Sequence, residues 1–282
     1  MPEITLIPIE KSDRKKLSDL FVEYQWNYMP DAILDGYIGE AYVDDEENPR
    51  IAVLEIPDFR MKLLGGDSTL PAAQQYIKQL SSGQWLFFGA PGWETLVRRY
   101  HRGRLVRLPR YAFTSESLDR KTLREFKSRL PEDYRLVKVD LEIAQQLVDE
   151  KNKIAEDHFR AFQSVEDFIA RGFGYCILYE GEVVCLATTF LICDKGIEIQ
   201  IDTRKSLRGK GLATVAAAQL IIHSIENNLD PNWDGDNKIS AGLAKKLGYT
   251  PQGKYSTVFV VRSRMKAITA KVTLKLLEVF NR

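Results

Sequence analysis

The sequence predicts a mixed α/β fold in two domains, and three observations support this prediction. Residues 197–202 alternate isoleucine with polar side chains, which is typical of a half-buried strand. Residues 212–220 are rich in alanine, with apolar side chains at helical spacing. Segments of both kinds alternate along the rest of the 282 residues, a length that suits two domains with separate cores.

The turn between this strand and this helix is basic and rich in glycine, and reads Arg208-Gly209-Lys210-Gly211. Glycine lets main-chain N–H groups approach a ligand, and a helix N-terminus adds unpaired donors and the positive end of its dipole. The turn therefore predicts a phosphate site. It is not a Walker loop, because no Ser or Thr follows Lys210, nor a dinucleotide fingerprint, because Thr214 stands where Gly or Ala is required.

Two segments of the sequence read Arg208-x-x-Gly211-x-Ala213 and Asn237-x-x-Ser240-x-x-Leu243-Ala244-x-x-Leu247-Gly248-Tyr249. They resemble two motifs of the GCN5-related N-acetyltransferases (GNAT). The first is similar to the pyrophosphate motif of that family, R/Q-x-x-G-x-G/A, and the second to a further family segment. The resemblance covers about residues 130–262, and it implies the acetyltransferase fold, a mixed and mostly antiparallel central sheet flanked by helices.

A charged helical connector, Ser115–Leu130, ends at Pro131 and suggests a domain boundary there. We expect an N-terminal α/β domain at 1–130 and the acetyltransferase-like domain at 131–282. In the first domain, the strand Arg50–Ile56, a glycine pair and the helix Pro71–Leu80 echo the phosphate unit without its basic turn. The smaller domain is either a degenerate copy of the same fold or an unrelated α/β domain.

The resemblance implies an acetyl-CoA-dependent N-acetyltransferase that moves an acetyl group to a primary amine. By resemblance, main-chain N–H groups of a splayed strand polarise the thioester, and those of the basic turn hold the coenzyme's pyrophosphate. The residues expected at the coenzyme are Ile201, Asp202, Thr203, Arg208, Gly209, Lys210, Gly211, Leu212, Ala213, Asn237 and Ser240. The alternative is a non-catalytic acyl-CoA-binding or sensor protein, favoured by Ala244 where the family usually has a general-acid tyrosine.

Glu198 is the candidate general base, and the other interpretation is a solvated residue on a strand edge. Gln200 and Asp202 share its face, which makes them candidates for the wall of a substrate groove. Ser240 or Tyr249 could replace the missing acid, although a tyrosine after a helix end is more often packed in a core. The active site is expected to open where the strand of Glu198 parts from a parallel neighbour, Tyr255–Val261.

Composition excludes several classes of protein. The net charge of +1 gives no general attraction to nucleic acid or anionic membranes, and no run of about 18 apolar residues could span a bilayer. The N-terminus lacks the pattern of a signal peptide. Three cysteines in apolar surroundings, without C-x-x-C spacing, indicate buried free thiols in a reducing cytoplasm: Cys176, Cys185 and Cys193.

Two further segments carry weaker signals. Asp230–Asp236 is predicted as a loop that resembles the first half of an EF-hand, but Ala241 replaces the last ligand, so no metal site is predicted. Six arginines within 98–110 suggest contact with an acidic partner or the other domain rather than nucleic acid. The expected partner is a small amine substrate, and the sequence leaves a homodimer open.

Overall fold

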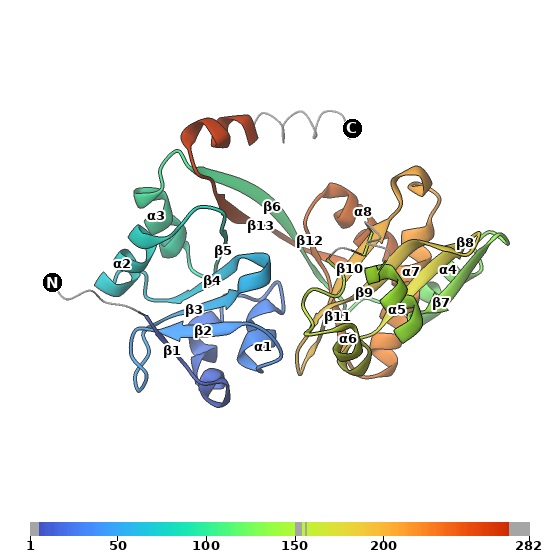
Figure 1. The fold of residues 1–282 in the computed structure, drawn as a ribbon, viewed down its shortest axis with the longest axis horizontal. Coiled ribbons are helices and arrows are strands. Elements are labelled where there is room, and N and C mark those ends of the chain that lie inside the picture. Colours follow the sequence, from blue (N-terminus) through green and yellow to red (C-terminus); the bar gives the residue numbers. More distant parts are fainter. Residues whose placement is uncertain (1–5, 150–153, 156, 271–282) are drawn as a thin grey trace. The chain divides into compact units, whose positions relative to one another are not determined.

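The structure is a computed structural model that describes residues 6–149, 154–155 and 157–270. Two units make up the chain, and each draws on separate stretches of sequence (Figure 1). Unit 1 takes in the chain up to Gln25, Ile33–Arg110 and the chain from Tyr255 onward. Unit 2 consists of Trp26–Ala32 and Tyr111–Lys254, so the boundary expected at residue 130 falls inside it.

The first part of the chain forms short strands and helices whose order is β1 (Ile7–Pro8), the 3₁₀ helix η1 (Lys11–Phe21), α1 (Met29–Leu34), β2 (Glu40–Val43), β3 (Ile51–Ile56), the 3₁₀ turn η2 (Pro57–Phe59), β4 (Met61–Gly66), α2 (Pro71–Gln79), β5 (Trp85–Phe88), α3 (Pro91–Tyr100) and β6 (Leu105–Thr114). In unit 1 the strands run in the order β1-β2-β3-β4-β5-β13-β6, in which β13 comprises Thr250–Val260. Neighbours from β1 to β4 are antiparallel, whereas β4 and β5 are parallel.

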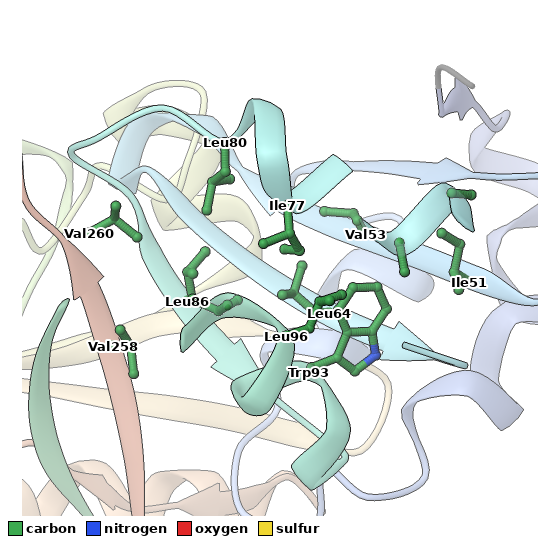
Figure 2. Packing of buried hydrophobic residues seen from close by; sticks show 13 residues of the cluster. Ile51, Val53, Leu64, Ile77, Leu80, Leu86, Trp93, Leu96, Val258 and Val260 are labelled. Atoms are coloured by element: carbon green, nitrogen blue, oxygen red, sulfur yellow. The ribbon is translucent and has the colours of Figure 1, made fainter. Parts of the chain in front are cut away.

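The core of unit 1 lies between this sheet and the helices α2 and α3. Both helices have a proline in the first turn, where the missing N–H has no helical partner to lose. Trp93 of α3 is fully buried and packs in one cluster with Leu64 and Leu96 (Figure 2). Its indole N–H donates to the carbonyl of Gly66 at 2.9 Å. The indole thus joins the helix to the end of β4.

The second part of the chain continues with α4 (Arg120–Lys127), β7 (Tyr134–Lys138), α5 (Leu141–Asp149), α6 (Val165–Arg171), β8 (Gly174–Tyr179), β9 (Glu182–Ile192), β10 (Gly196–Thr203), the 3₁₀ turn η3 (Lys205–Leu207), α7 (Leu212–Glu226), β11 (Asp230–Asn232), β12 (Asp234–Gly235), α8 (Lys238–Leu247) and β13 (Thr250–Val260). Five strands form one sheet in the order β11-β10-β9-β8-β7. All its neighbours are antiparallel except β10 and β11. This is the mixed, mostly antiparallel sheet that was expected, and α7 packs Leu212, Val215, Ala216 and Leu220 against it.

Two expectations about strand pairing are wrong. Asp230–Asp236 is not a loop, because it contains β11 and β12, and β11 is the parallel neighbour of β10. Tyr255–Val261 is not that neighbour, since Val258 and Phe259 of β13 pair antiparallel with β5 in unit 1. The alternation of side chains identifies a strand without identifying its partner, and Asp-Pro-Asn has low strand propensity.

The repeated order of elements that the sequence indicates is present in the structure. In unit 1, β3 and β4 are antiparallel, α2 connects β4 to its parallel neighbour β5, and α3 follows. In unit 2, β9 and β10 are antiparallel, α7 connects β10 to its parallel neighbour β11, and α8 follows after β12. Each unit therefore contains one parallel pair of strands joined by a helix.

The parallel pair of unit 1 is closed by a side chain. Pairing of β4 with β5 extends to Leu64 and Phe88. There the buried hydroxyl of Tyr24 donates to the carbonyl of Phe87 at 2.7 Å and accepts the main-chain N–H of Leu64 at 3.0 Å. A Cβ atom added to Gly89 would lie 2.8 Å from the ring of Tyr24, so the ring packs closely against the main chain of Gly89.

The Tyr24→Phe substitution is expected to lower the free energy of unfolding by about 1–3 kcal/mol, because it leaves buried main-chain groups without their partner. The matched control is Tyr42→Phe, whose hydroxyl contacts the exposed carboxylate of Glu40 and whose loss should change stability by less than about 0.5 kcal/mol. Urea denaturation measures both. Equal stability of Tyr24→Phe and wild type would contradict the bridging role of the hydroxyl.

Candidate active site

Strand β10 extends beyond its parallel neighbour. Its pairing with β11 ends at Glu198 and Asn232, whereas its pairing with β9 on the other side continues to Thr203 and Cys185. Among the described residues, no strand pairs with the β11-facing edge of residues 199–203. Main-chain N–H and C=O groups require partners, so this edge can receive hydrogen bonds from an extended ligand.

The turn that follows β10 has a conformation that only glycine adopts readily. Gly209 and Gly211 have φ angles of +81° and +82°, and a Cβ atom at either position would meet nothing within 4 Å. Their lack of a side chain is therefore required for the left-handed backbone and not for space. Gly211 is also the N-cap of α7, where no side chain caps the helix and no acidic residue occupies the first turn. The first N–H groups of α7 are thus available to an anion.

The two cations of the turn are exposed. Arg208 donates its Nε to the carbonyl of Thr203 at 3.1 Å, which ties the turn to the end of β10. Lys210 lies with its Nζ 3.4 Å from the hydroxyl of Tyr134. Leu212 is buried in the core and Ala213 is half-buried, so they can offer a ligand only their main chain. The structure therefore brings the predicted residues 208–213 together as one basic turn.

Glu198 is buried, with only 6% of its surface exposed, so its interpretation as a solvated strand residue is wrong. Its Oε1 accepts hydrogen bonds from the main-chain N–H of Tyr28 at 2.6 Å and from Nδ2 of Asn232 at 2.7 Å. The same Nδ2 lies 3.3 Å from the carbonyl of Trp26. The carboxylate thus joins the last paired residue of β11 to the segment 26–28.

A second carboxylate, Asp230, extends this network. It accepts a hydrogen bond from the hydroxyl of Tyr28 at 2.7 Å and another from the hydroxyl of Ser115. Burial and the bond to Asp230 raise the pKa of Tyr28, which keeps its hydroxyl protonated at neutral pH. Tyr28, Asn232 and Ser115 were not predicted as site residues, because no local pattern links positions so distant in sequence.

The residues of the second motif hold α8 in place. Asn237 is the N-cap of α8 and accepts the N–H groups of Ile239 and Ser240, each at 2.9 Å. The hydroxyl of Ser240 accepts the indole N–H of Trp233 at 3.1 Å. Each of these polar side chains is therefore engaged in a contact that defines the start of the helix.

Tyr249 belongs to the core of unit 2. Only 3% of its surface is exposed, and its hydroxyl donates to the carbonyl of Pro231 at 2.6 Å. Burial raises its pKa well above the ordinary value. The structure thus favours the packing interpretation of Tyr249 over a role as proton donor. Ala244 is fully buried in the same cluster.

The end of β10 divides its side chains between two faces. Ile199 and Ile201 pack on the core around α7, and Thr203 donates its hydroxyl to the sulfur of Cys185 at 3.2 Å. Gln200 and Asp202 alternate to the other face, where Nε2 of Gln200 donates to Oδ2 of Asp202 at 3.0 Å. The side chain of Asp202 is 38% exposed.

The expected buried free thiols are confirmed for all three cysteines. Burial raises the pKa of both Cys176 and Cys185 to about 12, so neither is a thiolate at neutral pH. Within the described part of the chain, no helix is long and apolar enough to cross a membrane. The same residues contain no group of three or more His, Cys, Asp or Glu side chains arranged to hold a metal ion.

Comparison with known proteins places this geometry in one family. Residues 19–258 match the sequence model of the GNAT acetyltransferase family. An uncharacterized N-acetyltransferase of Bacillus subtilis, YdfB, is 26% identical over 264 residues, which cover 89% of this chain and 98% of the relative. The crystal structure of a GCN5-related N-acetyltransferase-like protein from Streptococcus suis is 27% identical, with a TM-score of 0.75 over 88% of this chain and 98% of the other.

A solved structure with a similar fold over both units is also known. A tandem GNAT protein from the clavulanic acid biosynthesis pathway is 9% identical and has a TM-score of 0.60, over 90% of this chain and 97% of its own. This likeness agrees with the repeated β4-α2-β5 and β10-α7-β11 arrangement. The match of the family model to most of the sequence shows that the chain belongs to the GNAT acetyltransferase family.

Proposed function

We propose that the protein transfers an acetyl group from acetyl-CoA to a small primary amine, and that unit 2 carries the site. The observation that supports this most strongly is the continuous path from the unpaired edge of β10 at 199–203, through the left-handed turn at Gly209 and Gly211, to the uncapped N-terminus of α7. An extended ligand with a pyrophosphate at one end suits such a path.

The residues present suit the coenzyme. Main-chain N–H groups from Gly209 to Ala213 would hold the pyrophosphate, and the exposed cations of Arg208 and Lys210 would balance its charge. Main-chain N–H groups at Ile201–Thr203 would polarise the thioester carbonyl. When bound, acetyl-CoA supplies an acetyl group activated as a thioester.

The proposed reaction needs one proton acceptor. The nitrogen of a neutral amine forms a bond to the carbonyl carbon, the carbon–sulfur bond breaks with its electron pair going to sulfur, and the proton lost by nitrogen passes to the base. Glu198 remains the candidate base, directly or through water. The buried methyl group of Ala244 cannot donate a proton, so we assign no acid, and the thiolate leaves without one.

The second candidate is a non-catalytic acyl-CoA-binding protein. The buried Ala244 at the family's tyrosine position is the observation that favours it. The two candidates share the coenzyme site and differ in turnover, so acetylation of an amine separates them.

One coenzyme per chain is expected, because Tyr24 closes the parallel pair of unit 1. Calorimetric titration with acetyl-CoA should therefore give a single saturable site. Gly211→Ala should weaken affinity by about tenfold, since the turn relaxes away from its left-handed backbone and binding must restore it at roughly 1–2 kcal/mol.

The matched control is Gly181→Ala in the turn between β8 and β9. Gly181 has a φ of +83° and equally open surroundings, so its substitution costs similar stability without touching the turn at 208–211. Its acetyl-CoA affinity should equal that of wild type. The site assignment fails if Gly211→Ala binds as tightly as the control, and a stoichiometry of two would contradict the closure of unit 1.

Glu198→Gln separates proton transfer from anchoring. A glutamine oxygen can still accept from Tyr28 and Asn232, whereas it cannot take a proton at neutral pH. We expect the turnover of 1,4-diaminobutane to fall by about 100-fold or more, with acetyl-CoA affinity unchanged. Glu226→Gln, an exposed carboxylate of α7, is the control. Wild-type turnover by Glu198→Gln would leave Glu198 with the anchoring role alone.

A further inference from the structure

A buried histidine in unit 2 has one ring nitrogen without a hydrogen bond. His158 lies between α5 and α6 and is completely buried. Its Nδ1 is 2.7 Å from the hydroxyl of Thr188 on β9. Its Nε2 faces Oδ2 of Asp202 at 3.4 Å, a distance too long for a good hydrogen bond. Buried polar atoms in this state are uncommon in folded proteins.

The side chains around this histidine share one face of the sheet. Thr188 is directly opposite Gln200 in the register of β9 and β10, so both side chains point to the same side. Asp202 lies two residues after Gln200 on β10, so its side chain points to the same side of the sheet. Gln200 and Asp202 both lie within residues 199–203, the part of β10 that extends beyond its pairing with β11. The cluster therefore adjoins the strand edge that is proposed to hold the coenzyme.

The protonation of His158 follows from its surroundings. Burial lowers the pKa of the imidazole, so the ring is neutral near pH 7 and carries one N–H. We assign that proton to Nε2, because the Thr188 hydroxyl can donate to Nδ1, and a lone pair on Nε2 would otherwise face a carboxylate. His158 is then a neutral ring whose Nε2–H group lies 3.4 Å from Oδ2 of Asp202.

The cluster consequently carries an uncompensated negative charge. Gln200 donates to Oδ2 of Asp202, and Nε2 of His158 lies 3.4 Å from the same atom. Among the described residues, Oδ1 takes no hydrogen bond and no lysine or arginine forms an ion pair with Asp202. The side chain of Asp202 is 38% exposed, so its carboxylate is accessible to a cationic ligand.

We propose that Asp202 binds a protonated amino group of the acceptor, and that His158 and Gln200 are positioning residues that orient its carboxylate. The acceptor is then an amine that is cationic at neutral pH, and a neutral or acidic acceptor is disfavoured. This inference rests on the proposed function, because it specifies the substrate class of the same site. It assigns the acceptor to the face of β10 opposite α7.

The probe is 1,4-diaminobutane, titrated by calorimetry into protein saturated with coenzyme A. The variants are Asp202→Asn, which keeps the shape of the side chain and removes its charge, and Glu226→Gln, which removes one charge elsewhere in unit 2. Asp202→Asn should weaken diamine binding at least about tenfold. Glu226→Gln should bind like wild type, and both should keep wild-type affinity for coenzyme A.

The outcomes distinguish the two proposals. If coenzyme A does not bind wild type, the proposed function fails and this inference fails with it. If coenzyme A binds but wild type shows no saturable diamine site, or Asp202→Asn binds the diamine like wild type, only the assignment of Asp202 is overturned.

The role of His158 is tested by two substitutions of similar size. His158→Gln can keep an N–H donor directed at Asp202, whereas His158→Leu cannot. We expect His158→Leu to weaken diamine binding and His158→Gln to recover part of the loss, with coenzyme A affinity unchanged in both. Equal diamine affinity in the two folded variants would contradict a positioning role. Should neither fold, Asp202→Asn carries the test alone.

Discussion

Each unit depends on hydrogen bonds that are made where the pairing of its two parallel strands ends, at the end of β4 and β5 in unit 1 and of β10 and β11 in unit 2. Residues 24–28 contribute a polar group at this point in both units, to main-chain groups in unit 1 and to the side chain of Glu198 in unit 2. In unit 1 the hydroxyl of Tyr24 bonds to the main chain of Leu64 and Phe87. In unit 2 the N–H of Tyr28 bonds to Glu198, which also holds Asn232. The first bridge closes its strand pair, whereas β10 continues past the second with an unpaired edge.

The proposed chemistry is distributed along that continuation of β10. Its edge leads into a turn whose two left-handed glycines present N–H groups at the start of α7, where an anion is favoured. Its outer face carries Asp202, whose carboxylate is oriented by neutral donors and lacks a cation. In this proposal, residues 199–203 bind the coenzyme through main-chain groups and a cationic acceptor through the side chain of Asp202.

Local features could be predicted from the sequence, and long-range pairings could not. The strand, glycine turn and helix at 196–226 are specified by alternation, backbone freedom and helix propensity, and the structure reproduces them. Strand β11 could not be predicted, because Asp-Pro-Asn has low strand propensity and forms a strand only through its pairing with β10. The burial of Glu198 depends on Tyr28, which lies 170 residues away in the chain. His158 and Asp202 likewise meet only through the packing of a loop on the sheet.

The most direct test of the open strand edge in unit 2 is the change in backbone amide chemical shifts when coenzyme A is added to isotope-labelled protein. The largest changes are expected at residues 201–203 and 209–213. The amides of Gly65–Asp67, at the equivalent place in unit 1, should be unaffected, because Tyr24 closes that strand pair. Unchanged amides at 209–213, or comparable changes at Gly65–Asp67, would contradict an open pair in unit 2 and a closed pair in unit 1.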